Sequence, residues 1–182
     1  RRGRPMRAWL MDEEGGDQRL PHERTPPAPV DAAVLLALGV RQWHLPGGAE
    51  DPALAQVREE HGMAYADVVT VSPALEAYEE KLAMFYAEHM HDDDEIRLLL
   101  EGSGYFDVRD AADRWVRIEL LAGDMISLPA GIYHRFTVDQ TNYAKAMRLF
   151  VGEPVWTAHG RPADERPARK AYAAAHPLRA ND

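Results

Sequence analysis

The sequence predicts a mainly β protein, a sandwich or small barrel, with flanking helices in its N-terminal half. From about Arg97 to Val151, apolar residues recur at every second position in short runs that are separated by turn residues. This period is typical of strands, and short strands at close spacing favour a sandwich or a small barrel. Between residues 31 and 88 the apolar residues instead follow a helical spacing.

The whole-chain composition limits the possible functions. The chain has 182 residues, of which 46% are hydrophobic, which suits one domain with a real core. No apolar run approaches the roughly 20 residues of a membrane-spanning helix. A net charge of -9 argues against a nucleic-acid partner. With zero cysteines, any metal must be held by imidazole and oxygen.

Three parts of the chain are predicted from composition. Residues 1–5 are expected to be an upstream extension before Met6, and residues 6–165 a single domain. Residues 166–182, rich in Ala and Arg, are predicted to be a tail that is either helix or coil. Within the domain, residues 13–30 hold glycines and four prolines without an apolar period, which predicts an ordered loop or crossing segment rather than a helix.

Three helices are predicted in the N-terminal half. Asp31 can cap the first, "AAVLLAL". Asp51, followed by Pro52 at the first helical position, opens the second, "PALAQVREEH". The third is expected to begin at Ser72 and to end just before His89, with an apolar stripe formed by Leu75, Tyr78, Leu82 and Phe85.

The predicted strands are joined by recognisable turns. Alternation is clear in "YFDVR" and in "WVRIELL". A flexible bend is expected at Gly102–Gly104, a hairpin loop at "RDAADRW", and tight turns at "LAGD" and "PAGIYH".

A group of ligand-type side chains lies at the start of the first long strand. His89 and His91 are two residues apart and Glu95 is four further on, so all three project to one side if the strand continues. Alone this is weak evidence for a metal, because such histidine pairs are often surface or core residues. For Asp92–Asp94 a solvated acidic loop is the preferred interpretation.

A second segment, "GDMISLPAGIYHRF", adds a third imidazole. It predicts a strand, a turn that permits unusual backbone angles, and a return strand that opens with His134. The two segments together resemble the paired motifs of the cupin superfamily: His89-x-His91-x3-Glu95-x6-Gly102 and Gly123-x5-Pro129-x-Gly131-x2-His134.

The resemblance extends to a family within the cupins. Over residues 6–165 the chain is similar to eukaryotic acireductone dioxygenase in five stretches, "RAWLMDE", "YEEKLAMFYAEHMHDDDEIR", "GSGYFDVRD", "GDMISLPAGIYHRFTVD" and "YAKAMRLFVGEPVWTAHGRPAD". The resemblance implies a cupin small β-barrel (a double-stranded β-helix, jelly-roll-like) and one metal ion per monomer, held by His89, His91, Glu95 and His134.

The same resemblance implies an activity in methionine salvage. With Fe2+, acireductone and O2 would give formate and 2-keto-4-methylthiobutyrate; with Ni2+ they would give 3-(methylthio)propanoate, formate and CO. Both metals accept three imidazoles and a carboxylate, so the sequence does not choose between them. A monomer in the cytoplasm is expected. A nuclear fraction and a second role with a protein partner are left open.

Further residues are predicted around the metal. Arg148 lies among apolar neighbours, where an arginine needs an anionic partner, either the substrate enediolate or a structural acid such as Glu95. Arg97 is placed beside it as a second catalytic residue. Phe85, Phe106 and Phe136 can line an apolar substrate pocket or simply belong to the core. "GEPVWTAHGRP" is expected to fold over the barrel mouth.

Two other functions stay open at this point. One is a different metal-dependent cupin dioxygenase, and the other is a cupin that only binds a partner. The remaining histidines are interpreted as surface or capping residues: His22, His44, His61, His159 and His176.

Overall fold

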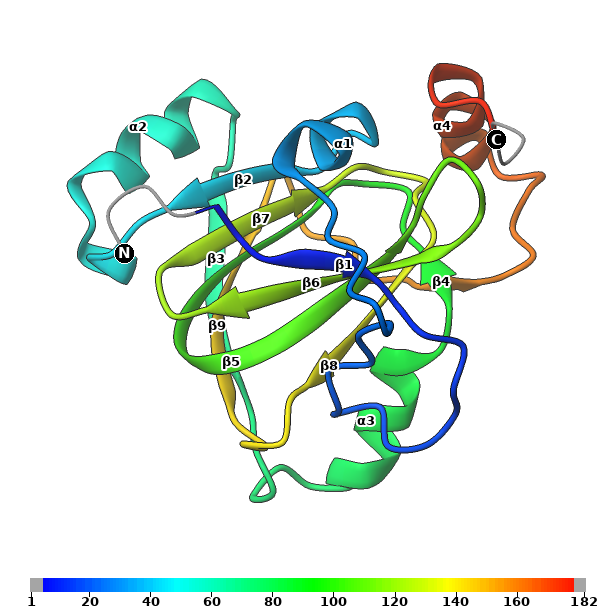
Figure 1. Cartoon of the computed structure of the whole chain (residues 1–182). Helices are drawn as coiled ribbons and strands as arrows, with labels where there is room; N and C mark the ends of the chain where they lie inside the picture. Colours follow the sequence, from blue (N-terminus) through cyan, green and yellow to red (C-terminus); the bar gives the residue numbers. More distant parts are fainter. Residues whose placement is uncertain (1–4, 179–182) are drawn as a thin grey trace.

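The computed structural model describes residues 5–178, which form two antiparallel sheets that share one long strand, β5 (Glu95–Arg109) (Figure 1). The first sheet is ordered β1 (Ala8–Leu10), β6 (Trp115–Leu121), β5, β8 (His134–Val138), β4 (His89–Met90) and β10 (His159–Gly160). The second is ordered β2 (Arg41–His44), β7 (Asp124–Leu128), β5, β9 (Ala144–Phe150) and β3 (Tyr65–Val71). The predicted mainly β class is confirmed.

Strand β5 runs through the glycines where a bend was expected, so that prediction is wrong. Gly102 has φ +78, and a Cβ there would collide with the carbonyl oxygen of Tyr143 on the approach to β9. The ladder between β5 and β9 shifts register between Leu99 and Glu101. Gly102 therefore permits close approach of a neighbouring chain segment at a bulge, inside one strand that continues from the second sheet into the first.

The first two helices begin where they were predicted. Asp31 accepts a hydrogen bond from the Val34 amide at 2.9 Å at the start of α1 (Ala32–Ala37). Asp51 caps α2 (Pro52–Glu60) in the same way through the Ala53 amide, 2.9 Å away. A short 3-10 helix, η1 (Gly48–Glu50), precedes α2.

The third helix is shorter than expected. Helix α3 (Tyr78–Tyr86) starts after Ala77, whose left-handed φ of +53 interrupts any helix that began at Ser72. It packs beside β8 (Figure 1). The tail, for which helix and coil were both open, contains α4 (Pro167–Ala175).

Three strands of the N-terminal part, β1, β2 and β3, were not predicted. Strand β3 alternates regularly between half-buried and exposed residues, so its period was visible in "YADVVTV". Strand β2 has only four residues, which is too short to show a period.

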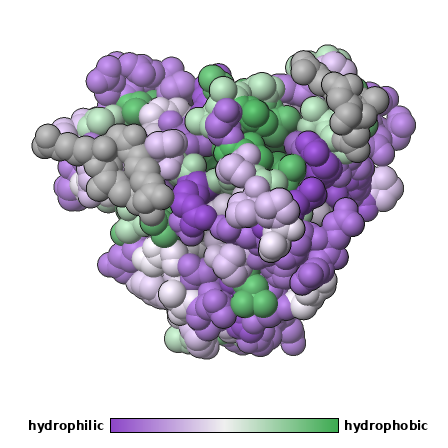
Figure 2. Space-filling model, viewed as in Figure 1, coloured by the Kyte–Doolittle hydropathy of each residue, from purple (hydrophilic) through white to green (hydrophobic). Residues whose placement is uncertain are grey.

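The main core fills the barrel and includes Phe106, Val108, Ile118, Ile126 and Leu128. A second cluster packs α2 against the outer face of the second sheet through Leu54, Val57 and Met125. Figure 2 shows an apolar patch over α1, where Val34 is 46% and Leu36 is 62% exposed. Among residues 5–178, no helix has both the length and the hydropathy required to cross a membrane.

The predicted crossing segment is ordered and is fixed to the outside of the first sheet by a buried arginine. Arg117 is 0% exposed and donates to the carbonyl oxygens of Gln18, at 2.9 Å, and Leu20, at 2.5 Å. Its charge is met by Asp107 through hydrogen bonds of 2.8 and 2.9 Å.

Candidate metal centre

Four predicted ligand residues converge in the structure. One ligand atom from each of His89, His91, Glu95 and His134 can be chosen so that all lie within 4.8 Å of one another. His89 and His134 are paired across β4 and β8. Glu95 Oε2 lies 2.7 Å from His134 Nε2 and 3.1 Å from His91 Nε2. Such a set of three imidazoles and one carboxylate can hold a divalent ion.

Backbone carbonyls fix the orientation of all three imidazoles. The Nδ1–H groups of His89, His91 and His134 donate to the carbonyl oxygens of Ala87, Thr157 and Ile132 at 2.7, 2.8 and 2.9 Å, respectively. A carbonyl only accepts, so each Nδ1 carries the hydrogen in the neutral ring. In that neutral ring Nε2 has the lone pair that a metal ligand requires, whereas Nε2 of His91 and of His134 donates to Glu95 when the ring is protonated.

The charges at the cluster are set by burial and by the neighbouring groups. Burial lowers the pKa of His89 to about 4, so this ring is neutral at pH 7. Burial alone would raise the pKa of Glu95, but Arg97 and then His134 outweigh it and hold that pKa well below the usual range. Burial opposes charge on His91, but the hydrogen bond to Glu95 outweighs it and raises the pKa of His91.

The acidic loop after His91 is exposed, as expected, and two of its aspartates also make specific contacts. Asp92 pairs with Arg166 at 2.8 Å and with His159 at 3.1 Å. Asp94 accepts a hydrogen bond from the Ala130 amide at 2.9 Å. These contacts join the loop between β4 and β5 to the segments that follow β7 and β10.

The two predicted arginines are directly opposite each other on β5 and β9, and they have different partners. Arg97 lies 3.3 Å from Glu95, so Glu95, which was the predicted structural partner of Arg148, pairs with Arg97. Arg148 instead pairs with Asp67 on β3. Asp67 was not predicted, although an acid on the half-buried face of "YADVVTV" could have indicated a buried partner.

The three predicted phenylalanines form one cluster. The ring centroids of Phe85 and Phe136 are 6.3 Å apart, and those of Phe106 and Phe136 are 5.1 Å apart. Phe106 is 3% exposed and belongs to the main core. Phe136 follows His134 by two residues on β8, so it shares the face of the ligand.

The segment expected to fold over the barrel mouth does lie beside the cluster. The Thr157 carbonyl binds His91, as described above. The guanidinium carbon of Arg148 is 4.1 Å from the centroid of Trp156, and that of Arg97 is 5.7 Å from it. Trp156 is therefore placed over the two arginines.

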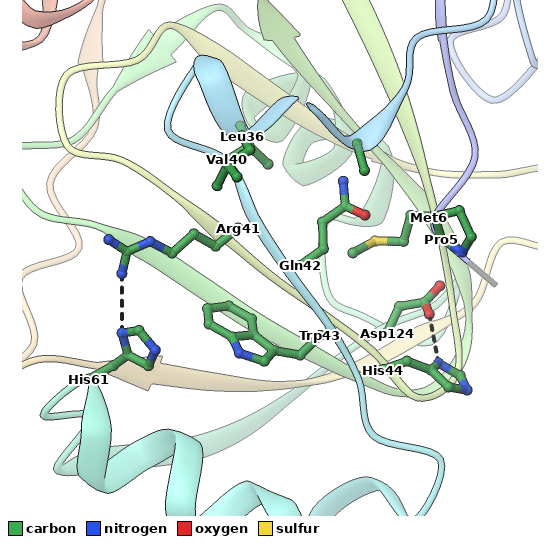
Figure 3. A pocket seen from close by; sticks show the side chains of 11 residues that line it. Pro5, Met6, Leu36, Val40, Arg41, Gln42, Trp43, His44, His61 and Asp124 are labelled. Atoms are coloured by element: carbon green, nitrogen blue, oxygen red, sulfur yellow. Dashed lines mark hydrogen bonds and ion pairs between the residues drawn. The ribbon is translucent and has the colours of Figure 1, made fainter. Parts of the chain in front are cut away.

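A separate hollow of about 580 Å³ lies along the edge strand β2, and none of the four clustered residues lines it (Figure 3). It contains two of the histidines that were interpreted as surface or capping residues. His44 is hydrogen-bonded to Asp124 at 3.1 Å, and His61 is hydrogen-bonded to Arg41 at 3.1 Å. Both imidazoles therefore have protein partners in this hollow.

Comparisons with known proteins converge on one family. The ARD/ARD' family matches residues 7–158. Acireductone dioxygenase of Danio rerio is 58% identical over 169 residues, which cover 91% of this chain and 93% of that protein. Acireductone dioxygenase of Branchiostoma floridae is 54% identical over 168 residues, which cover 92% and 95% of the two chains.

The fold is also that of a solved relative. The structure of "Acireductone dioxygenase from Bacillus anthracis with cadmium ion in active center" has a TM-score of 0.65 at 24% identity and covers 84% of this chain and 97% of that one. This match confirms the predicted cupin barrel with flanking helices.

Proposed function

Because the chain belongs to the ARD/ARD' family of acireductone dioxygenases, we propose that His89, His91, Glu95 and His134 hold the divalent metal ion of this activity. The observation that carries this proposal is the convergence of their four ligand atoms within 4.8 Å. The donor set fits the group, because the Nδ1 atoms of the imidazoles already have backbone partners and the carboxylate is charged. Three imidazoles with one carboxylate suit both iron(II) and nickel(II).

When bound, the ion would act as a Lewis acid that stabilises the enediolate of acireductone. We propose that the iron form serves methionine salvage, giving formate and 2-keto-4-methylthiobutyrate. The nickel form would instead release CO, formate and 3-(methylthio)propanoate. Support for acireductone as the substrate comes from the names of relatives that are 54–58% identical.

The surrounding side chains bind and shield the substrate in this proposal. Arg97 and Arg148 carry the positive charges next to the cluster, so they stabilise and orient an enediolate. The cluster of Phe85, Phe106 and Phe136 offers apolar surface for the methylthioethyl tail. Trp156, stacked on the arginines, limits the access of water.

Product analysis tests this function directly. The metal-free protein would be reconstituted anaerobically with iron(II) or nickel(II), and then mixed with acireductone and O2. We expect formate and the keto acid with iron, and CO only with nickel. No loss of substrate above the metal-free control would contradict the proposal and would favour a different dioxygenase substrate or a binding role.

We also propose that the protein is a monomer of the cytoplasm with a nuclear fraction. A monomeric state is tested by analytical ultracentrifugation of the metal-loaded protein. A location in the cytoplasm, with a nuclear fraction, is tested by cell fractionation.

A further inference from the structure

Arg148 is held by one carboxylate on the neighbouring strand. Its Nε donates to Asp67 Oδ1 at 2.7 Å and its Nη2 donates to Asp67 Oδ2 at 2.5 Å. Two parallel hydrogen bonds of this kind fix the plane of a guanidinium as well as its distance. The carboxylate is itself fixed, because Tyr65 Oη donates to Asp67 Oδ2 at 2.8 Å.

The pair belongs to a row of charges across three adjacent strands. Asp67 on β3 is directly opposite Arg148 on β9, and Arg148 is directly opposite Arg97 on β5. Directly paired residues point to the same face of a sheet, and so do residues two apart on one strand. Glu95 therefore shares this face, and it lies 3.3 Å from Arg97.

Asp67 and Glu95 are the two carboxylates at the ends of this row of charges, so without Asp67 the row would offer Arg148 only Glu95. Glu95 is one of the proposed metal ligands, and a second guanidinium on it would compete with the ion for its oxygens. The pairing with Asp67 prevents this competition. It also leaves Nη1 of Arg148 without a hydrogen-bond partner among residues 5–178, so this nitrogen is free to donate to a ligand.

We infer that Asp67 is a positioning residue, which holds Arg148 away from Glu95 and in place to bind the substrate anion. This inference rests on the proposed function for its substrate part. Its metal part is independent of any turnover. Asp67 acts through Arg148 alone, so each consequence of losing its charge must depend on the presence of Arg148.

The test is a cycle of four proteins: wild type, Asp67→Asn, Arg148→Ala and the double variant. Asparagine keeps the shape of the side chain but loses the charge and one of the two acceptors. Asp113→Asn is the matched control, because Asp113 also makes a bidentate pair, with Arg161, at 2.9 and 3.0 Å, in a surface loop. Thermal unfolding of each protein checks that it is folded.

The first readout is nickel(II) affinity, measured by competition with a chromophoric chelator in the absence of substrate. We expect the affinity of Asp67→Asn to fall by about 10-fold, as when a contact to a metal ligand is disturbed, and to return to the wild-type value in the double variant. An affinity of Asp67→Asn equal to wild type, or a loss that persists in the double variant, would overturn the inference.

The second readout is turnover of acireductone by the iron form. We expect kcat/KM of Asp67→Asn to fall by about 10- to 100-fold, and to fall no further than in Arg148→Ala when the two changes are combined. Additive losses would overturn the inference. If the wild type itself shows no turnover, the proposed function fails, and the nickel cycle alone then decides the role of Asp67.

Discussion

The three imidazoles of the candidate metal centre differ in their surroundings but are oriented by the same kind of contact. Each Nδ1 donates to a carbonyl, so the neutral ring presents Nε2 to the cluster. The sequence predicted all four clustered residues through the paired motifs of the family that it resembles. The single strand that was expected to run from His89 through Glu95 is wrong, because β4 ends at Met90 and β5 begins at Glu95, with a loop between them. The sequence did not predict the orienting contacts, because a backbone carbonyl has no signature in the sequence.

We predict that His91→Ala loses its metal while it stays folded. One lost ligand weakens a site of four far more than it weakens a packed barrel, and even a disturbed contact to a ligand typically costs about 10- to 100-fold in affinity. Elemental analysis after purification, together with thermal unfolding, measures both effects. His176→Ala, which alters a ring stacked on Tyr172 in the tail, is the control and should keep its metal. Normal metal content in His91→Ala would remove His91 from the ligand set.

At the level of the secondary-structure elements, the sequence predicted those whose ends carry local signals. Asp31 and Asp51 cap their helices as expected. The predicted start of α3 was wrong because Ser72 and Pro73 suit a turn as well as a helix, and an alanine gives no signal in the sequence of the left-handed φ that Ala77 adopts. The prediction of a bend at Gly102–Gly104 was wrong because glycine is typical both of turns and of places where two chain segments approach closely. Only the position of the neighbouring segment, here Tyr143, distinguishes the two cases.

The turn before His134 shows a close approach of this kind, and it yields a prediction. Gly131 has φ +84, and a Cβ there would collide with the carbonyl oxygen of Ala168 in α4 and lie 2.8 Å from the Tyr172 Cβ. We expect Gly131→Ala to lower the free energy of unfolding by about 1–3 kcal/mol from the backbone conformation alone, and to loosen α4.

Urea unfolding and limited proteolysis at Arg169 and Lys170 measure these two effects. Gly15→Ala is the control, because Gly15 has open space within 4 Å and no strained φ. Equal stability of Gly131→Ala and wild type would show that α4 does not depend on this turn.

A cluster of ion pairs joins β5 to the chain before β4 and after β10, and it makes stability depend on pH. Glu88 binds Arg109 at 2.9 Å and Arg161 at 2.9 Å. Burial would raise the pKa of Glu88, but these two arginines outweigh it and lower the pKa below the usual 4.5. The folded state therefore binds this proton less readily than the unfolded state, so the stabilisation is complete above about pH 4.5 and is lost as the pH falls further.

We predict that Glu88→Gln lowers the free energy of unfolding by about 2 kcal/mol at pH 7, and that its difference from wild type shrinks below pH 4.5. Urea titrations between pH 7 and pH 3 measure this difference. Glu13→Gln, at an exposed position without an ion pair among the described residues, should follow wild type throughout. A difference that does not change with pH would mean that the carboxylate charge is not responsible.

For the molecule as a whole, the buried pair of Arg117 and Asp107 joins the N-terminal crossing segment to the barrel. Asp107 also accepts a hydrogen bond from Arg135 at 2.8 Å. The sequence predicted an ordered crossing segment but not its anchor. An arginine and an aspartate in alternating strands look like ordinary solvent-facing residues until a further layer of chain covers that face.

We expect Asp107→Ala to lower the free energy of unfolding by about 3–5 kcal/mol, because it leaves a fully buried guanidinium without its acid. Asp17→Ala, which breaks an exposed pair with Arg19, should cost no more than about 1 kcal/mol. Urea unfolding of both variants compares them directly. A cost for Asp107→Ala as small as that of the exposed pair would show that the buried charge is compensated by another group.

The orientation of the imidazoles by carbonyls has a consequence for the evolution of the protein. Every amino acid carries the same carbonyl, so residues 87, 132 and 157 can change during descent without loss of the acceptor that each ring needs. The orientation of the imidazoles thus depends on the path of the main chain. The side chains at these three positions do not supply the acceptors, so their identities are constrained only by their other contacts. A site built in this way tolerates mutation around it better than one that is oriented by carboxylates, where a single substitution would remove the acceptor itself.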